Sequence, residues 1–194
     1  MAVYTKISKK DISYINRKFD IEKILEFKGI KQGIENTNYL LKSKNKKFIL
    51  TIFEKRVSKK ELPFFMNLMD KLNKSKINCP KPQTKKGGGY LINLKNKAAC
   101  IVSFLNGKDK KSLNFKNCYD IGKMIAEMHQ STKKMNLTRK NSMGVRYLNP
   151  LLKSIKFKSK KFSNIEKFLK NNFKDIKTKW PKNLPSGVIH GDLF

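Results

Sequence analysis

Arginine, acidic residues and cysteine are all scarce in this chain of 194 residues. The three cysteines are widely spaced and form no Cys-x-x-Cys pair, so the sequence predicts neither a disulfide framework nor a zinc cluster. No apolar run approaches the ~20 residues of a membrane-spanning helix. The opening residues, MAVYTKISKKDIS, lack the apolar core of a secretory signal. We therefore expect a soluble, cytoplasmic protein with no membrane partner.

The net charge of +31 comes from 45 cationic residues against 14 acidic ones. Only four of the cations are arginines, and the remaining 41 are lysines scattered through nearly every segment. Specific readers of bases and phosphates favour arginine, because its planar guanidinium binds them through two parallel hydrogen bonds. The composition therefore favours a solvated, lysine-rich surface over a specific nucleic-acid site. Weak binding to any polyanion at low salt is still expected from charge alone.

The first half of the chain has the pattern of a small sheet with one helix inserted. Hydrophobic residues make up 39% of the sequence and include 13 phenylalanines, enough for a sizeable core in one domain or slightly more. Helical spacing predicts a short helix over 9–19 and a longer one over 59–74. β-Branched and aromatic runs predict strands near 21–27, 36–41, 46–56, 87–94 and 97–107.

From residue 114 onward the apolar period becomes helical. Helices are predicted from Asn114 and over 163–176, the first with Phe115 and Cys118 on its apolar face. A short strand and a polar turn, SGVIHGDLF, then follow. Together these elements predict an α+β fold, with an N-terminal antiparallel sheet lobe over 1–105 and a helical lobe over 106–194. The three cysteines stand in apolar surroundings and are expected in the core.

Two short segments carry polar groups suited to chemistry. Near the C-terminal end, Asp192 follows an expected buried strand (Val188 and Ile189) and a tight turn. A carboxylate held there is able to accept a proton from a substrate hydroxyl. The alternative is that Asp192 caps the next element and His190 is a packed core histidine.

The second segment, residues 28–41, joins two strands. It carries two glycines and two amide side chains, which suit a hairpin whose backbone approaches a ligand closely. These residues are Gly29, Gly33, Asn36 and Asn38.

Taken together, these stretches resemble the homoserine kinases of the protein-kinase-like aminoglycoside phosphotransferase superfamily. The resemblance rests on FKGIKQGIENTNYLL, KFILTIFEKRV, ELPFFMNLMDKL, AACIVSFLNG and WPKNLPSGVIHGDLF, and it extends through the whole chain. It implies transfer of the ATP γ-phosphate to the hydroxyl of L-homoserine, a step of threonine biosynthesis, with Mg²⁺ bridging the phosphates. Two alternatives stay open: a related kinase of choline, methylthioribose or aminoglycosides, and an inactive fragment that binds nucleotide.

The resemblance assigns roles to particular residues. Asp192 would be the catalytic base and His190 would brace its turn, while the hairpin from Gly29 to Asn38 would cover the ATP phosphates. The position of the phosphate-binding lysine of related kinases is occupied here by Thr51, so Lys55 is a candidate replacement. Its alternative is a solvated lysine.

Three further positions complete the expected nucleotide site. Glu61, at the start of the inserted helix, is a candidate partner for such a lysine or an ordinary helix-dipole residue. The run from Ser103 to Leu105 would form the hinge that binds adenine, or else is an ordinary strand edge.

The superfamily pattern places an Asn at position 197 and a later Asp as the Mg²⁺ ligands, whereas the sequence ends at Phe194. No metal ligand is therefore assigned within these residues. We expect the sequence to be an incomplete record of a longer kinase.

Overall fold

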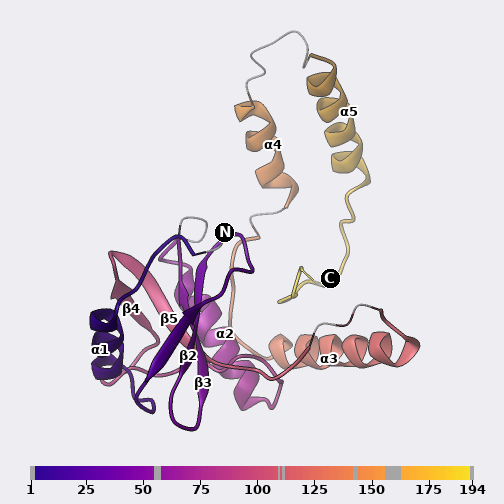
Figure 1. The fold of residues 1–194 in the computed structure, drawn as a ribbon. Helices are drawn as coiled ribbons and strands as arrows, with labels where there is room; N and C mark the ends of the chain where they lie inside the picture. Colours follow the sequence, from indigo (N-terminus) through magenta and orange to yellow (C-terminus); the bar gives the residue numbers. More distant parts are fainter. Residues whose placement is uncertain are drawn as a thin grey trace. The chain divides into compact units, whose positions relative to one another are not determined.

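The computed structural model describes residues 3–54, 58–108, 110, 112–141, 144–155 and 163–192. Contacts between residues divide the chain into two compact units, Met1–Leu137 with Val188–Phe194, and Thr138–Gly187. Among these described residues, the first unit contains the sheet and three helices, and the second contains two helices (Figure 1). The boundary between lobes at residues 105 and 106 stays a prediction.

A five-stranded antiparallel sheet forms the centre of the first unit, in the order β1-β2-β3-β5-β4. This confirms the five strands expected from the sequence, with a helix inserted between β3 and β4. The strands are β1 (Glu26–Gly29), β2 (Thr37–Lys42), β3 (Lys47–Ile52), β4 (Leu91–Leu94) and β5 (Lys97–Ser103).

Helix α1 (Lys9–Lys18) covers one face of this sheet, which we call the α1 face. The helix begins at a capping box, in which Ser8 and Asp11 each bond the other's backbone N–H. Its apolar side, with Phe19 just beyond its end, packs into the main core. The core residues include Ile12, Ile15, Phe19, Tyr39, Leu41, Phe48, Leu50, Ile52, Ala99 and Ile101.

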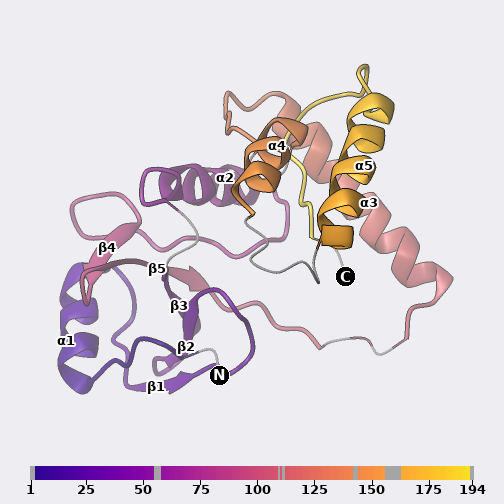
Figure 2. The ribbon, with the colours of Figure 1, turned by 90° about the horizontal axis from the view of Figure 1, so that it is seen from above.

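Helix α2 (Leu62–Lys74) covers part of the opposite face, the α2 face (Figure 2). Met66 packs there on Cys100 and Val102, with Ile49 and Phe53 partly buried beside them. Alternation along each strand sends these side chains away from those that meet α1. The sheet is therefore packed on both faces, but α2 covers its own face only in part.

The later helices depart from the sequence-based expectation in burial. Helix α3 (Phe115–Lys133) begins where the sequence predicts a helix, and Asn114 is its N-cap. Phe115, however, is 87% exposed and Cys118 is also exposed, so the expectation of a core Cys118 was wrong. Cys100 is buried as expected and Cys79 is half-buried.

The last third of the chain differs from the sequence-based expectation at two places. Helix α4 (Val145–Ser154) was not expected, because Pro150 lies inside it and proline normally ends a helical pattern. Helix α5 (Ser163–Lys179) was expected. The buried strand at Val188 and Ile189 is absent: no described strand pairs with these residues, and Ile189 is 66% exposed.

Among the helices of the described residues, none combines the length and apolar character needed to cross a membrane.

Candidate functional site

The loop over residues 30–36, between β1 and β2, is the glycine loop expected from the sequence. Gly33 adopts φ of +103°, a left-handed conformation that favours glycine. At the base of the loop, the N–H of Ile30 donates to the carbonyl of Asn38 over 2.9 Å and extends the ladder. The loop therefore has a fixed base.

Gly29 lies within β1, opposite Tyr39, and not in the loop itself. A Cβ added at Gly29 would meet Cγ2 of Val3 at 3.0 Å, which is closer than real Cβ contacts normally allow. The absence of a side chain at Gly29 thus makes room for the N-terminal segment. Its expected part in binding phosphate stays a prediction.

Asn38 and Thr51 lie side by side on the α2 face, on paired positions of β2 and β3. The Thr51 hydroxyl donates to Oδ1 of Asn38 over 2.8 Å. Leu40 and Ile49, the next pair on the same face, are only partly buried. An amide–hydroxyl pair therefore adjoins an apolar surface, a combination suited to a ligand with both polar and flat apolar parts. Thr51 supplies no positive charge, and Lys55 lies outside the described residues.

The predicted hinge begins at the end of β5, and its first two residues are tied into the fold. Ser103 exchanges two bonds with Lys81: its N–H donates to the Lys81 carbonyl over 2.9 Å, and its Oγ accepts from the Lys81 N–H over 2.9 Å. The N–H of Phe104 donates to the carbonyl of Lys47 over 3.2 Å. These two N–H groups therefore serve the fold, whereas Leu105 is 41% exposed.

Glu61 is the residue that precedes α2, half-buried, with a helical backbone. Its side chain does not cap the helix. The pairing of Glu61 with Lys55 stays a prediction, since the lysine is not among the described residues.

The tripeptide His190-Gly191-Asp192 lies in an irregular segment near the C-terminal end, without an assigned helix, strand or turn. Gly191 has φ of +77°, which a residue with a side chain rarely adopts. Both His190 and Asp192 are exposed, so His190 is not the packed core histidine of the alternative interpretation. An accessible carboxylate is able to meet a substrate, as general-base catalysis requires.

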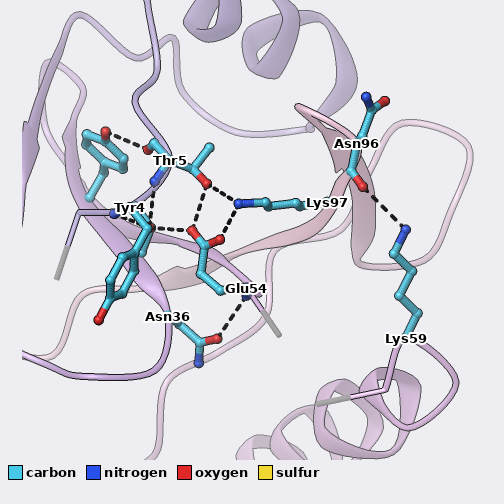
Figure 3. A network of polar contacts seen from close by, with 9 residues as sticks. Tyr4, Thr5, Asn36, Glu54, Lys59, Asn96 and Lys97 are labelled. Atoms are coloured by element: carbon cyan, nitrogen blue, oxygen red, sulfur yellow. Dashed lines mark hydrogen bonds and ion pairs between the residues drawn. The ribbon is translucent and has the colours of Figure 1, made fainter. Parts of the chain in front are cut away.

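A buried polar network on the α1 face was missed by the sequence analysis (Figure 3). At its centre the Glu54 carboxylate, just past β3, accepts from the hydroxyls of Thr37 and Thr5 over 2.6 and 2.7 Å. It also pairs with the ammonium group of Lys97, at the start of β5. That ammonium group donates in turn to the Thr5 hydroxyl over 2.7 Å.

The electrostatics of Glu54 follow from these partners. Burial by itself would raise the pKa of Glu54, because a carboxylate loses hydration. Hydrogen bonds from Lys97, Thr37 and Thr5, together with the charge of Lys97, outweigh burial and hold the pKa below its ordinary value. Glu54 is therefore ionised at neutral pH, and the hydrogen bonds and the charge of its partners stabilise the carboxylate.

The same network joins the glycine loop. The hydroxyl of Thr37, the first residue after the loop, accepts the N–H groups of Tyr4 and Thr5 over 3.0 and 3.1 Å. The hydroxyl of Tyr4 donates to the carbonyl of Ile34, within the loop, over 2.8 Å. No sequence motif marks these residues, since they come from four separate segments of the chain. Only the alternation that turns Thr37 and Glu54 to one face carried a signal.

Metal ligands are not gathered within the part of the chain that the structure describes: it holds no group of three or more His, Cys, Asp or Glu side chains suited to an ion. The described residues therefore do not by themselves make a Mg²⁺ site.

Comparison with known proteins gives consistent similarities. The model of the phosphotransferase enzyme family matches residues 26–194. Curated relatives include the homoserine kinases of Rhizobium etli and Paramagnetospirillum magneticum, which are 36% and 37% identical over 195 residues. The match covers 100% of this chain but 61% and 60% of those proteins. The chain thus spans about three-fifths of the length of the curated relatives it matches.

Solved structures show the fold. Spectinomycin phosphotransferase, in complex with ADP and spectinomycin, gives a TM-score of 0.58 at 15% identity, covering 90% of this chain and 56% of that one. A microcompartment-associated aminopropanol kinase gives 0.58 at 13% identity, covering 74% and 48%. The α+β architecture expected from the sequence is therefore the protein-kinase-like fold of these phosphotransferases. With a family match over most of its length, the chain belongs to the phosphotransferase enzyme family.

Proposed function

We propose that the complete protein is a homoserine kinase, which transfers the γ-phosphate of ATP to the side-chain hydroxyl of L-homoserine. The observation that carries the proposal is the match to homoserine kinases at 34–37% identity over 100% of this chain. Membership of the phosphotransferase family supports an ATP-dependent transfer to a hydroxyl group. A role in threonine biosynthesis and a cytoplasmic location follow from the same proposal.

In this proposal the nucleotide binds on the α2 face of the sheet lobe, residues 1–105. The apolar surface of Leu40 and Ile49 would meet the base, with the hinge from Ser103 to Leu105 at its edge. The glycine loop would cover the phosphates, since backbone N–H groups at a glycine turn suit anions. The Asn38–Thr51 pair would hydrogen-bond the nucleotide, and Lys55 would supply a positive charge.

The acceptor hydroxyl would lose its proton to Asp192, whose accessible carboxylate suits a general base. His190 would hold the turn that carries it. As the proton leaves, the homoserine oxygen forms its bond to the γ-phosphorus and the bond to the β-phosphate oxygen breaks, releasing ADP. Mg²⁺, expected from the resemblance, has no cluster of ligands among the described residues, so we derive no step through it.

Kinetics on the full-length gene product test the proposal. Phosphorylation measured by coupled ADP release should respond to L-homoserine far more than to L-serine, choline or methylthioribose. Asp192→Asn should lower kcat by about 10²-fold or more, the scale of a lost general base, with little change in the KM for ATP. A rate that is indifferent to homoserine would refute the substrate, and an Asp192→Asn variant at full rate would refute the base.

A further inference from the structure

The N-terminal segment, residues 3–7, contacts the glycine loop at one point and the residues that flank the loop at two others. At the start of the loop, Cγ2 of Val3 packs over Gly29. In the middle, the Tyr4 hydroxyl bonds the Ile34 carbonyl. At the end, the N–H groups of Tyr4 and Thr5 both donate to Thr37. One short segment therefore contacts the loop and the two residues that flank it.

The segment is itself held by buried polar groups, and Thr5 is the central one, with only 8% of its surface exposed. Its hydroxyl donates to Glu54 and accepts from Lys97. Its carbonyl accepts from the hydroxyl of Tyr39 over 2.9 Å. Breaking these bonds would leave the Glu54 carboxylate with one partner fewer and the Thr5 carbonyl without the Tyr39 hydroxyl, which is costly for buried groups, so the arrangement is rigid.

The network lies on the α1 face, away from the Asn38–Thr51 pair on the α2 face. It contacts the loop from the α1 face, at the end of the sheet where β1 leads into the loop and the loop leads into β2. The backbone N–H of Glu54 adds a bond to the Asn36 side chain, the last residue of the loop, over 3.4 Å. The contacts are thus suited to fixing the loop without occupying the ligand face.

We infer that Thr5, Glu54 and Lys97 are positioning residues, which hold the glycine loop in the conformation that covers the phosphates of the nucleotide. The inference rests on the proposed function only in naming the nucleotide. A loop fixed before binding loses less conformational entropy when the ligand arrives. Loosening it should therefore weaken nucleotide binding while leaving the sheet folded.

The test compares Thr5→Val with Thr5→Ser in the full-length gene product. Valine keeps the shape of threonine but removes the hydroxyl, whereas serine keeps the hydroxyl. We expect Thr5→Val to raise the KM for ATP about tenfold, the scale of one lost charge-assisted hydrogen bond, with the KM for the acceptor unchanged. Thr5→Ser should restore a value within about twofold of the wild type. Glu54→Gln should behave like Thr5→Val.

A matched control is Glu26→Gln, which removes the carboxylate charge of another ion pair on the same sheet. Glu26 pairs with Lys42 over 3.0 Å at the end of β1 far from the loop, and both side chains are exposed. This variant should keep the wild-type KM for ATP. Hydrogen exchange of residues 30–36 should accelerate in Thr5→Val and stay unchanged in Glu26→Gln.

The outcomes separate the inference from the proposed function. An active wild type whose KM for ATP and loop exchange are both unmoved by Thr5→Val would overturn the inference alone. A wild type without homoserine-dependent turnover would overturn the proposed function, and ATP affinity measured by calorimetry would then replace the KM. A uniform loss of folded protein in Thr5→Val that Thr5→Ser fails to rescue would also count against a positioning role.

Discussion

Removing the Lys97 charge should destabilise the sheet lobe, because Glu54 would stay buried without its cationic partner. The Glu54 side chain is 10% exposed and that of Lys97 is 36% exposed. Loss of one member of a fully buried pair costs ~3–5 kcal/mol of unfolding free energy. Lys97 is partly hydrated and the two threonine hydroxyls remain bonded to Glu54, so we expect about 2 kcal/mol for Lys97→Met.

Urea unfolding at pH 7.5 measures this loss, with Lys42→Met as the matched control. The Lys42–Glu26 pair is exposed on both sides, with 46% and 69% of the two side chains accessible, and should cost less than ~0.5 kcal/mol. Equal losses from the two variants would refute the reasoning, because burial would then make no difference.

The pH dependence gives an independent check. The folded-state pKa of Glu54 is depressed, so its contribution to stability is present above the unfolded-state pKa of a glutamate and is lost as the pH falls through the folded-state value. In Lys97→Met the pKa should rise, since burial raises it and the largest opposing hydrogen bond is gone. Carbon-13 NMR of the Glu54 carboxyl should show a titration midpoint below pH 4.5 in the wild type. In Lys97→Met the midpoint of the same titration should be higher. An unchanged midpoint would contradict the account.

Three further predictions concern packing and reactivity. Gly29→Ala should cost about 1 kcal/mol of unfolding free energy, because the new Cβ would meet Val3. Adding Val3→Ala should relieve that clash. Strictly additive effects of the two substitutions in a thermal double-mutant cycle would exclude the contact. Phe19→Ala should cost about 3–5 kcal/mol in urea unfolding, since Phe19 is fully buried, whereas Phe115→Ala, at a side chain 87% exposed, should cost under ~0.5 kcal/mol. Toward a thiol reagent at pH 8, the exposed Cys118 should react first. Cys100 should react last, because burial raises the pKa of its thiol to about 12. A fast reaction phase that survives Cys118→Ser would contradict this order.

The sheet was predictable because its signals are local. β-Branched runs such as KFILTI mark the strands, and the amphipathic stretch from Leu62 marks the inserted helix. Helix α4 was not predicted, and Pro150 within it is a local signal against a helix. The burial expected for Cys118 failed for another reason: helical spacing shows which side chains share a face, but not whether anything covers that face.

The candidate site was predictable only where a motif is contiguous. The glycine loop and the His190-Gly191-Asp192 tripeptide are short stretches of chain, so their composition alone indicates them. The Thr5–Glu54–Lys97 network joins residues up to 92 positions apart, which meet because the N-terminal segment packs against the paired strands β2, β3 and β5. Glycine in a loop suggests a ligand, but at Gly29 the space is filled by Val3, a contact that no pattern within residues 28–41 contains.

The most direct test of the central claim is the ADP-release assay on the full-length gene product, with L-homoserine as acceptor and O-phosphohomoserine identified by mass spectrometry. The account predicts one phosphorylated homoserine for each ADP released, loss of turnover in Asp192→Asn, and little or no turnover with choline or methylthioribose. Efficient turnover of one of those other acceptors, with homoserine left unmodified, would contradict it.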